Sequence, residues 1–287
     1  MFFELTPELF IDKIPRRRSG SRKGENGRVL VLGGNWLYHG APFHSARGAQ
    51  ASGVDLVYIA VPKQISSALR SMSADFIVYP LPDTKLTLGA VNRLLKWLPE
   101  IDSAIIGPGT VKPPQKSMQR LLLELKSRGI AVVLDAGALE KENVQLLTDS
   151  KAVITPHAGE FKRITDIELP ADDADRARIV AESARKLGVV ILQKGKGDVI
   201  SDGKTTFFNR TGRAAMTVGG TGDVLAGLTA GLLALGVEPL YAAAVAAYAN
   251  GLAGTSAWEK FGNRITASDL HLELRYALKQ FERPDID

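Results

Sequence analysis

Short apolar segments that alternate with longer amphipathic ones constrain the fold of this chain more than any other feature. The apolar segments are rich in valine and isoleucine and have the length of buried β-strands. An amphipathic segment of helical length lies between most neighbouring pairs, so the order strand, helix, strand recurs. The pattern predicts an α/β fold with a mostly parallel sheet and helices on both faces. The expected strands span residues 29–32, 56–61, 76–79, 104–106, 131–134, 152–154 and 189–192, and the expected helices span 43–51, 86–98, 115–128 and 174–187.

The pattern changes late in the chain. Asp202 and Gly203 stand between two short apolar runs, 198–201 and 205–208, which predicts a hairpin and an antiparallel part of the sheet. Two apolar helices are expected to follow, over 224–235 and 240–257, and Gly227 and Gly231 suit close packing of the first helix against the sheet. Glu238 and Pro239 break this apolar region into pieces shorter than the ~20 residues that a bilayer requires, so we expect no membrane partner.

Composition limits the class of protein further. With 287 residues, of which 45% are hydrophobic, the chain can bury a full core, and no repeat or change of composition marks a second domain. We therefore expect one domain over residues 1–287, with residues 1–24 as a basic N-terminal extension. The chain has no cysteine, which excludes disulfides, thiolate metal sites and redox thiols, and no secretory signal pattern is evident at its start. A cytoplasmic location is expected.

A basic segment lies between Arg16 and Arg28. It holds six of the chain's lysines and arginines, interleaved with serine and glycine, and the formal net charge of the chain is +5. No aromatic side chains interleave with these charges, and no recognition-helix pattern accompanies them, so we expect no nucleic-acid partner. The segment is interpreted as a solvated loop that could lie toward a nucleotide.

A glycine loop, residues 219–223, precedes the first late helix. Gly219, Gly220 and Gly222 allow the backbone to approach a ligand closely, and a helix beginning beside Thr221 would direct its free N–H groups at an anion. Asp223 is oddly placed for anion binding alone, because a carboxylate repels phosphate. It either takes a proton from an attacking hydroxyl or caps the helix, and the loop alone does not decide between these roles.

Glycine-rich or polar turns follow five of the expected strands. In parallel sheets, ligands bind outside the carboxyl ends of the strands, so these turns are expected to converge on one site. The turns are residues 33–35, 107–109, 135, 155–160 and 194–198.

An ordered set of motifs carries a resemblance to a known family. Residues 38–42, 107–109, 155–160, 194–197 and 219–223 together resemble the ADP/ATP-dependent NAD(P)H-hydrate dehydratases, which have a ribokinase-like three-layer fold. The likeness runs from about residue 24 to about residue 270. It implies that a nucleotide phosphorylates the hydroxyl of the S epimer of hydrated NADH or NADPH. Loss of phosphate then restores NAD(P)H, and ADP is converted to AMP.

The resemblance also implies roles for individual residues. Asp223 would be the catalytic base and also contact the substrate, and residues 219–222 would bind the phosphoryl anion. The remaining residues implied are Ala41, Gly109 and His157 for the hydrate, and Lys194, Gly195, Lys196, Gly197, Asp198 and Gly222 for the nucleotide.

Simpler roles stay open for several of these side chains. His157 is expected to tether a polar group of the substrate, or only to occupy a turn at a helix start. Lys194 and Lys196 would neutralise phosphate or form a basic hairpin corner. Glu160 would hold Mg²⁺ through water, or only support a helix N-terminus.

The resemblance implies Mg²⁺ and ADP, or less favourably ATP, as cofactor and co-substrate. It also implies a homotetramer and a stand-alone dehydratase that works with a separate NAD(P)H-hydrate epimerase. The chain departs from the family pattern at Gly137, where a second acid is frequent, at Ala158, where proline is frequent, and at Asp198, where threonine is common.

Two other functions are compatible with the same motifs. A kinase of a vitamin precursor or sugar needs the same glycine loop and base, but its product keeps the phosphate. A regulatory protein that only binds a nucleotide would gain by losing the negative charge of Asp223.

Overall fold

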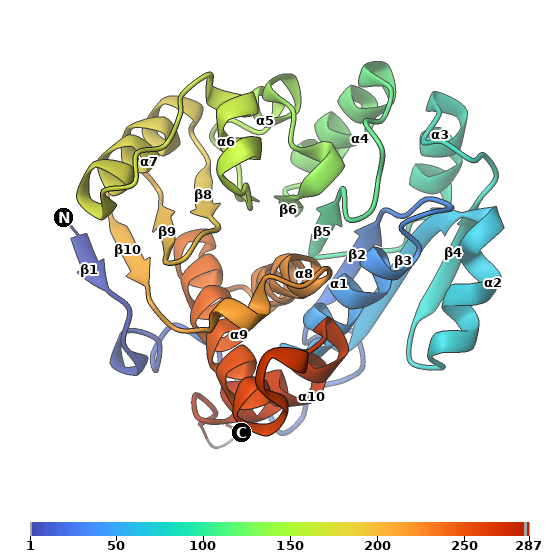
Figure 1. The fold of residues 1–287 in the computed structure, drawn as a ribbon. Helices are drawn as coiled ribbons and strands as arrows, with labels where there is room; N and C mark the ends of the chain where they lie inside the picture. Colours follow the sequence, from blue (N-terminus) through green and yellow to red (C-terminus); the bar gives the residue numbers. More distant parts are fainter. Residues whose placement is uncertain (1, 284–285, 287) are drawn as a thin grey trace.

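A single ten-stranded sheet forms the centre of the computed structural model, which describes residues 2–283 and Ile286 (Figure 1). The strand order is β1-β10-β9-β8-β7-β6-β5-β2-β3-β4. Only the β8–β9 and β9–β10 pairs are antiparallel, so the predicted mostly parallel sheet with a late hairpin is confirmed. The strands are β1 (Phe2–Glu4), β2 (Arg28–Leu32), β3 (Leu56–Pro62), β4 (Ile77–Leu81), β5 (Ser103–Ile106), β6 (Ala131–Leu134), β7 (Ala152–Ile154), β8 (Val190–Gln193), β9 (Asp198–Ser201) and β10 (Thr206–Asn209).

Helices cover both faces of the sheet, which gives the predicted three layers (Figure 1). Successive residues of a strand point to opposite faces, so Val29 and Val31 belong to one buried cluster and Leu30 and Leu32 to the other. Helices α1, α2, α8, α9 and α10 contribute to the first cluster, and α3 to α7 contribute to the second. The helices are α1 (Gly40–Ala51), α2 (Lys63–Met72), α3 (Leu88–Trp97), α4 (Gln115–Ser127), α5 (Lys141–Leu146), α6 (Ala158–Thr165), α7 (Asp173–Leu187), α8 (Thr221–Ala234), α9 (Pro239–Phe261) and α10 (Ala267–Lys279).

Glycines bring α8 into backbone contact with α1. A Cβ at Gly227 would lie 1.9 Å from the carbonyl oxygen of Ser45, and a Cβ at Gly231 would lie 2.7 Å from that of Ala49. Gly48 of α1 is equally tight, since its Cβ would lie 2.1 Å from the carbonyl oxygen of Val224. The expectation that Gly227 and Gly231 pack against the sheet is therefore corrected: they pack against α1, and this contact fixes the position of the N-terminus of α8.

Some helices differ from the expected ones. Helices α2, α5 and α10 lie outside the predicted ranges, whereas α6 begins at the helix start considered for His157 and Glu160. Helix α8 begins at Thr221, so that it includes the end of the glycine loop. In the part of the chain that the structure describes, even the longest helix, α9, falls short of the apolar length needed to cross a membrane.

The basic segment lies at the amino edge of the sheet. Arg28 opens β2 and forms hydrogen bonds with Asp102, at 3.0 Å from Nε, and Glu100, at 2.7 Å. Arg17 contacts Asp55 at 2.7 Å. Since the glycine turn that begins at Gly33 follows the other end of β2, the segment does not lie toward the predicted nucleotide edge, and that expectation is corrected.

Candidate active site

The carboxyl ends of β6, β7 and β8 bring three predicted turns together. The turn after β7 and the residue after β8 are joined by a parallel bridge between His157 and Lys194, and the backbone N–H of Lys194 donates to Pro156 at 2.8 Å. Asp135 directly follows β6, and its backbone N–H donates to Ile106 of β5 at 3.1 Å. The sheet therefore assembles segments that are far apart in the sequence, as its parallel order requires.

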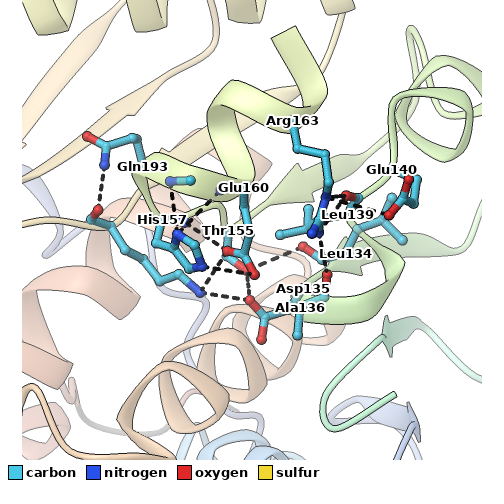
Figure 2. Close-up of polar contacts among 12 residues, drawn as sticks. Leu134, Asp135, Ala136, Leu139, Glu140, Thr155, His157, Glu160, Arg163 and Gln193 are labelled. Atoms are coloured by element: carbon cyan, nitrogen blue, oxygen red, sulfur yellow. Dashed lines mark hydrogen bonds and ion pairs between the residues drawn. The ribbon is translucent and has the colours of Figure 1, made fainter. Parts of the chain in front are cut away.

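A lysine whose side chain is 20% exposed lies among carboxylates at this edge. Lys194 Nζ is 2.9 Å from Asp135 Oδ1 and 3.9 Å from Glu160 Oε2. The Asp135 side chain is 3% exposed and also accepts a hydrogen bond of 2.7 Å from Thr155 Oγ1 (Figure 2). Burial opposes the charge on Lys194, but the carboxylates, first Asp135 and then Glu160, outweigh it, so the pKa of Lys194 lies above its ordinary value.

Asp223 of α8 is coupled electrostatically to this cluster. It is the third residue of α8 and is half-buried. Burial raises its pKa from an ordinary value of 3.8 to about 7, and the negative charge of Asp135 adds to the effect, while Lys194 opposes it. A carboxylate with a pKa near neutrality is suited to act as a general base, because it both accepts and releases a proton at working pH. Such perturbed groups concentrate at functional sites.

The glycine loop forms the start of α8. Gly220 is the N-cap residue and has a left-handed backbone, with φ +98°. The N–H groups of the first helical turn have no partner within the helix, so they are available to an anion. Gly222 lies beside Lys194, since a Cβ there would be 3.5 Å from Nζ. The Thr221 hydroxyl points back into the protein, where it donates to Met216 at 2.8 Å, and Gly219 is exposed.

Two helices clamp the N-cap of α8. A Cβ at Gly220 would lie 2.8 Å from Ala267 Cβ of α10 and 3.0 Å from His44 Cδ2 of α1. His44 Nδ1 and His271 Nε2 of α10 are 3.1 Å apart and join the two helices. Burial, followed by the neighbouring His44, lowers the pKa of His271 to about 4, so the pair is neutral at pH 7. Sequence reasoning missed this pair, for which a histidine inside a mostly apolar helix was the available signal.

His157 and Glu160 form a reciprocal cap at the start of α6. His157 Nδ1 accepts from the backbone N–H of Gly159 at 3.0 Å, and Glu160 Oε2 accepts from the backbone N–H of His157 at 2.9 Å (Figure 2). The open question on Glu160 is thus answered in part, because support of a helix N-terminus is observed. His157 Nε2 lies 3.6 Å from Glu160 Oε1, and the ring is 61% exposed.

Gly109, in the turn after β5, and Ala41, in the first turn of α1, lie against each other. Gly109 has φ +66°, and a Cβ there would be 2.9 Å from Ala41 Cβ and 2.5 Å from the carbonyl oxygen of Tyr38. Asn35 holds this region in place: its Nδ2 donates to Gly109 at 2.8 Å, and its Oδ1 accepts from Tyr38 N at 3.0 Å. The structure therefore places two of the predicted substrate-binding positions in contact.

The turn between β8 and β9 holds the predicted nucleotide segment. Gly195 and Lys196 are exposed, while Gly197 is buried and accepts a 3.0 Å hydrogen bond from Arg176. Asp198 Oδ1 accepts from the backbone N–H of Gly195 at 3.1 Å, and its Oδ2 accepts from Asn209 at 3.0 Å. Burial raises the pKa of Asp198. The Asp198 side chain holds the turn in shape through these two hydrogen bonds, which is a structural reason for an acid at position 198.

Gly137 leaves no room for a second acid. A Cβ at Gly137 would lie 2.2 Å from the carbonyl oxygen of Thr110. In the part of the chain that the structure describes, no group of three His, Cys, Asp or Glu side chains is arranged to hold a metal ion directly. Any cation here would be held by fewer direct ligands, with water completing its shell.

Comparison with known proteins gives consistent results. Residues 29–275 match the NAD(P)H-hydrate dehydratase family. The chain is 49% identical over 271 residues to the ADP-dependent (S)-NAD(P)H-hydrate dehydratase of Cenarchaeum symbiosum, covering 94% of each chain. It is 47% identical to the enzyme of the same name from Nitrosopumilus maritimus, covering 97% of this chain and 98% of that one.

A solved structure agrees with these sequence matches. The ADP/ATP-dependent NAD(P)H-hydrate dehydratase of Bacillus subtilis, co-crystallised with ATP/Mg²⁺, superposes with a TM-score of 0.83 at 27% identity. The match covers 98% of this chain and 99% of that one.

Proposed function

The chain belongs to the NAD(P)H-hydrate dehydratase family, and we propose that it uses ADP to dehydrate the S epimer of NADH hydrate or NADPH hydrate. The products are NADH or NADPH, AMP and phosphate. The observation that carries this proposal is Asp223, a base with a pKa of about 7 in the first turn of a glycine-capped helix and within the electrostatic influence of Lys194. Relatives at 47–49% identity bear the same activity in their names, which favours a dehydratase over a kinase that keeps its phosphoester.

Phosphoryl transfer forms the first step. Asp223 takes the proton of the hydroxyl on the hydrated ring while that oxygen attacks the terminal phosphorus of ADP. The bond between this phosphorus and the bridging oxygen breaks, and AMP leaves with the electron pair. The N–H groups of Gly220 to Gly222 stabilise the phosphoryl oxygens, and Lys194 supplies a positive charge beside them.

Elimination forms the second step. The bond between the ring carbon and the phosphate oxygen breaks, and phosphate leaves with the electron pair. The neighbouring ring carbon loses a proton to water or to the departing phosphate, and the C–H electron pair restores the ring double bond. Ala41, Gly109 and His157 hold the hydrated ring in this proposal, and Lys194, Gly195, Lys196, Gly197, Asp198 and Gly222 hold the nucleotide.

The donor set at the site suits Mg²⁺. Carboxylate oxygens are the ligands that this ion prefers, and it retains several waters when bound. Glu160 Oε2 accepts one hydrogen bond, from the backbone N–H of His157 at 2.9 Å, and lies 3.9 Å from Lys194 Nζ, beyond hydrogen-bonding distance. The Glu160 carboxylate therefore keeps acceptor capacity for a bound water. Glu160 and Asp135 would therefore hold the ion through its water shell, and the ion would neutralise charge on the nucleotide phosphates.

The partners follow from the chemistry. An enzyme restricted to the S epimer leaves the R epimer unrepaired, so it requires a separate epimerase. We also propose a homotetramer and a cytoplasmic location, in keeping with a chain that has no cysteine.

The test is recovery of reduced-nicotinamide absorbance from hydrated NADH with Mg²⁺ and either ADP or ATP. We expect recovery with ADP, and Asp223→Asn should lower the rate by about 10²–10⁴-fold because the base is lost. Asp166→Asn is the control, since Asp166 is exposed and pairs with Lys141 away from the site. A phosphorylated product that keeps its phosphate would instead identify a kinase, and binding of both nucleotides without turnover would identify a regulatory protein.

A further inference from the structure

A cavity adjoins the turn that carries Gly109, at the carboxyl edge of the sheet. It has a volume of about 670 Å³, within the range of small-molecule sites, and its lining is predominantly apolar. Leu32, Ile106 and Met118 form part of its lining and belong to the buried core, so the cavity reaches down to the sheet. Pro62 and Leu86 form part of its walls.

The mouth of this cavity holds unusually exposed apolar side chains. Leu37, Trp36 and Val111 are 74%, 71% and 70% exposed, more than any other large hydrophobic residue in the part of the chain that the structure describes, and all three line the cavity. Exposed apolar side chains that gather around a concave surface mark a place where a partner or ligand covers them.

The loop that carries these side chains is held in a fixed position. Asn35 Oδ1 accepts from the backbone N–H of Leu37 at 2.7 Å, and Asn35 Nδ2 donates to the carbonyl oxygen of Gly109 at 2.8 Å. One side chain thus connects the cavity wall to the position predicted to hold the hydrated ring. A fixed loop keeps Trp36 near the cavity at little entropic cost when a ligand binds.

The order of strands places this cavity on the far side of Gly109 from the predicted nucleotide turn. Along the edge, the predicted nucleotide turn follows β8, Asp135 follows β6, Gly109 follows β5, and the cavity lies beyond the ends of β2, β3 and β4. Four strand steps of about 4.8 Å separate β6 from β4, so the edge offers roughly 19 Å from the charge cluster to the far strand. A molecule whose reactive ring lies at Gly109 can therefore extend its other half into the cavity.

We propose that this cavity binds the adenosine half of the dinucleotide hydrate, with the Trp36 indole packed against the adenine ring. The inference rests on the proposed function, because it assumes that the hydrated ring lies at Gly109. Adenine is flat with apolar faces, which suits an apolar cavity beside a tryptophan. Lys85 and Lys112 line the cavity as well; Lys112 Nζ is 2.9 Å from Glu140, whereas Lys85 forms no ion pair with any described residue. Such cations suit the phosphates that join the two halves of the substrate.

The experiment compares two substrates on the full chain: hydrated NADH, and the hydrate of reduced nicotinamide mononucleotide, which has no adenosine. Trp36→Ala should raise KM for hydrated NADH by about 10-fold to 100-fold, the range expected for loss of one stacked base. Its KM for the mononucleotide hydrate and for ADP should stay within about twofold. Leu86→Trp, which fills the cavity, should produce the same selective loss. Trp258→Ala is the control, because Trp258 is an exposed tryptophan outside the cavity and should change neither value.

Each alternative result overturns the inference in a recognisable way. Equal KM increases for both hydrates would show that the cavity does not bind the adenosine half. An increase in KM for ADP would show that the cavity binds the co-substrate instead. A change in oligomeric state on size-exclusion chromatography, together with equal effects on both substrates, would show that a second copy covers the apolar mouth.

Failure of the proposed function is seen separately, as absence of turnover of both hydrates by the unaltered protein. In that case, equilibrium dialysis of the two hydrates against the unaltered protein and Trp36→Ala decides the inference. If Trp36→Ala weakens binding of the dinucleotide hydrate but not of the mononucleotide hydrate, the inference is supported. If the substitution changes the binding of both hydrates equally, the inference is overturned.

Discussion

The two edges of the one sheet treat charge in opposite ways. At the amino edge, a cavity of about 1110 Å³, the larger of the two described, is lined by Arg17, Arg28 and their neighbours. There Arg17 contacts Asp55, whose side chain is 7% exposed, and Arg28 contacts Asp102 and Glu100, which are 34% and 85% exposed. At the carboxyl edge, the ammonium of Lys194 forms ion pairs with Asp135 and Glu160 and is also influenced by the charge of Asp223.

The difference shows which feature identifies the chemistry. Cavity size and basic composition both point to the amino edge, where Arg17, Arg28 and Arg283 form ion pairs that stabilise the fold. At the carboxyl edge, three carboxylates lie near one lysine in a partly buried cluster. Burial, together with the uncompensated negative charge, raises the pKa of Asp223. Such an arrangement costs stability and is typical of a functional site.

Removal of the central cation should have the largest effect. Lys194→Met leaves Asp135 and Glu160 buried without their counter-ion, so we expect a loss of about 3–5 kcal/mol in the free energy of unfolding and at least a 100-fold loss of activity. Arg28→Met, at the amino edge, breaks pairs with partners that are 34% and 85% exposed and should cost at most about 1 kcal/mol, with activity within twofold. Urea unfolding at pH 7.5 measures the stability of the two variants, and initial rates measure their activity. Equal losses of stability would contradict the proposed difference between the two edges.

The pH dependence of stability should have opposite signs for one acid of each edge. The folded pKa of Asp223 is about 7 against an ordinary 3.8, so the folded state holds its proton more tightly. Stability from this group is therefore lost as pH rises from about 4 to about 7, by up to about 4 kcal/mol. Asp223→Asn removes this loss, and its melting temperature should exceed that of the unaltered protein at pH 8 but not at pH 4.

Asp55 should behave in the reverse manner. Burial alone would raise its pKa, but hydrogen bonds from Asn26, Gly24 and Arg17 outweigh burial, so its pKa lies below the ordinary value. Its contribution is present at neutral pH and is lost as pH falls through the folded pKa. Asp55→Asn should lower the melting temperature at pH 7, with a smaller difference at pH 3. If the two substitutions changed the melting temperature in the same direction at each pH, the assignment of a raised pKa to Asp223 would be refuted.

Two glycines with a left-handed backbone, one at each edge, allow the cost of backbone strain to be compared with the cost of a steric clash. Gly53, at the amino edge, has φ +94° and nothing within 4 Å of an added Cβ, so Gly53→Ala should cost about 1 kcal/mol. Gly220 has nearly the same angle, but its Cβ would press on Ala267 and His44, so Gly220→Ala should cost about 3 kcal/mol. The second variant should also raise KM for ADP, because the loop moves; thermal unfolding and initial rates test both.

Sequence reasoning predicted the parts of the molecule that local chemistry determines. The runs rich in valine and isoleucine became strands within one or two residues, because buried parallel strands need continuous apolar segments. The glycine loop and Asp223 were recognisable because left-handed backbone and an acid beside it are unusual together. The family, and with it the three-layer fold, was predicted from the order of such turns, and the comparisons confirm it.

Long-range side-chain contacts were not predictable in this way. Asp135 and Lys194 are 59 positions apart, and His44 and His271 are 227 apart, so no local pattern joins them. The Thr221 hydroxyl faces the preceding turn and not the loop, which depends on the path of residues 216–218. The roles of the individual site residues stay predictions until they are measured.

Loss of Arg17 should have the smallest effect, and it tests whether the amino edge is as redundant as its contacts imply. Arg17→Gln removes the 2.7 Å contact with Asp55, but the guanidinium is on a side chain that is 50% exposed. Asp55 Oδ2 keeps hydrogen bonds from the backbone N–H groups of Gly24, at 2.8 Å, and Asn26, at 3.1 Å. We therefore expect a loss of at most about 1 kcal/mol. In 1 M salt, where the screening length is about 3 Å, most of this loss should disappear, whereas the loss for Lys194→Met should persist because its partners are buried. Urea unfolding at low and high salt distinguishes the two variants. If the stability loss for Arg17→Gln were as large and as resistant to salt as that for Lys194→Met, the two edges would not differ in how their charges contribute to stability.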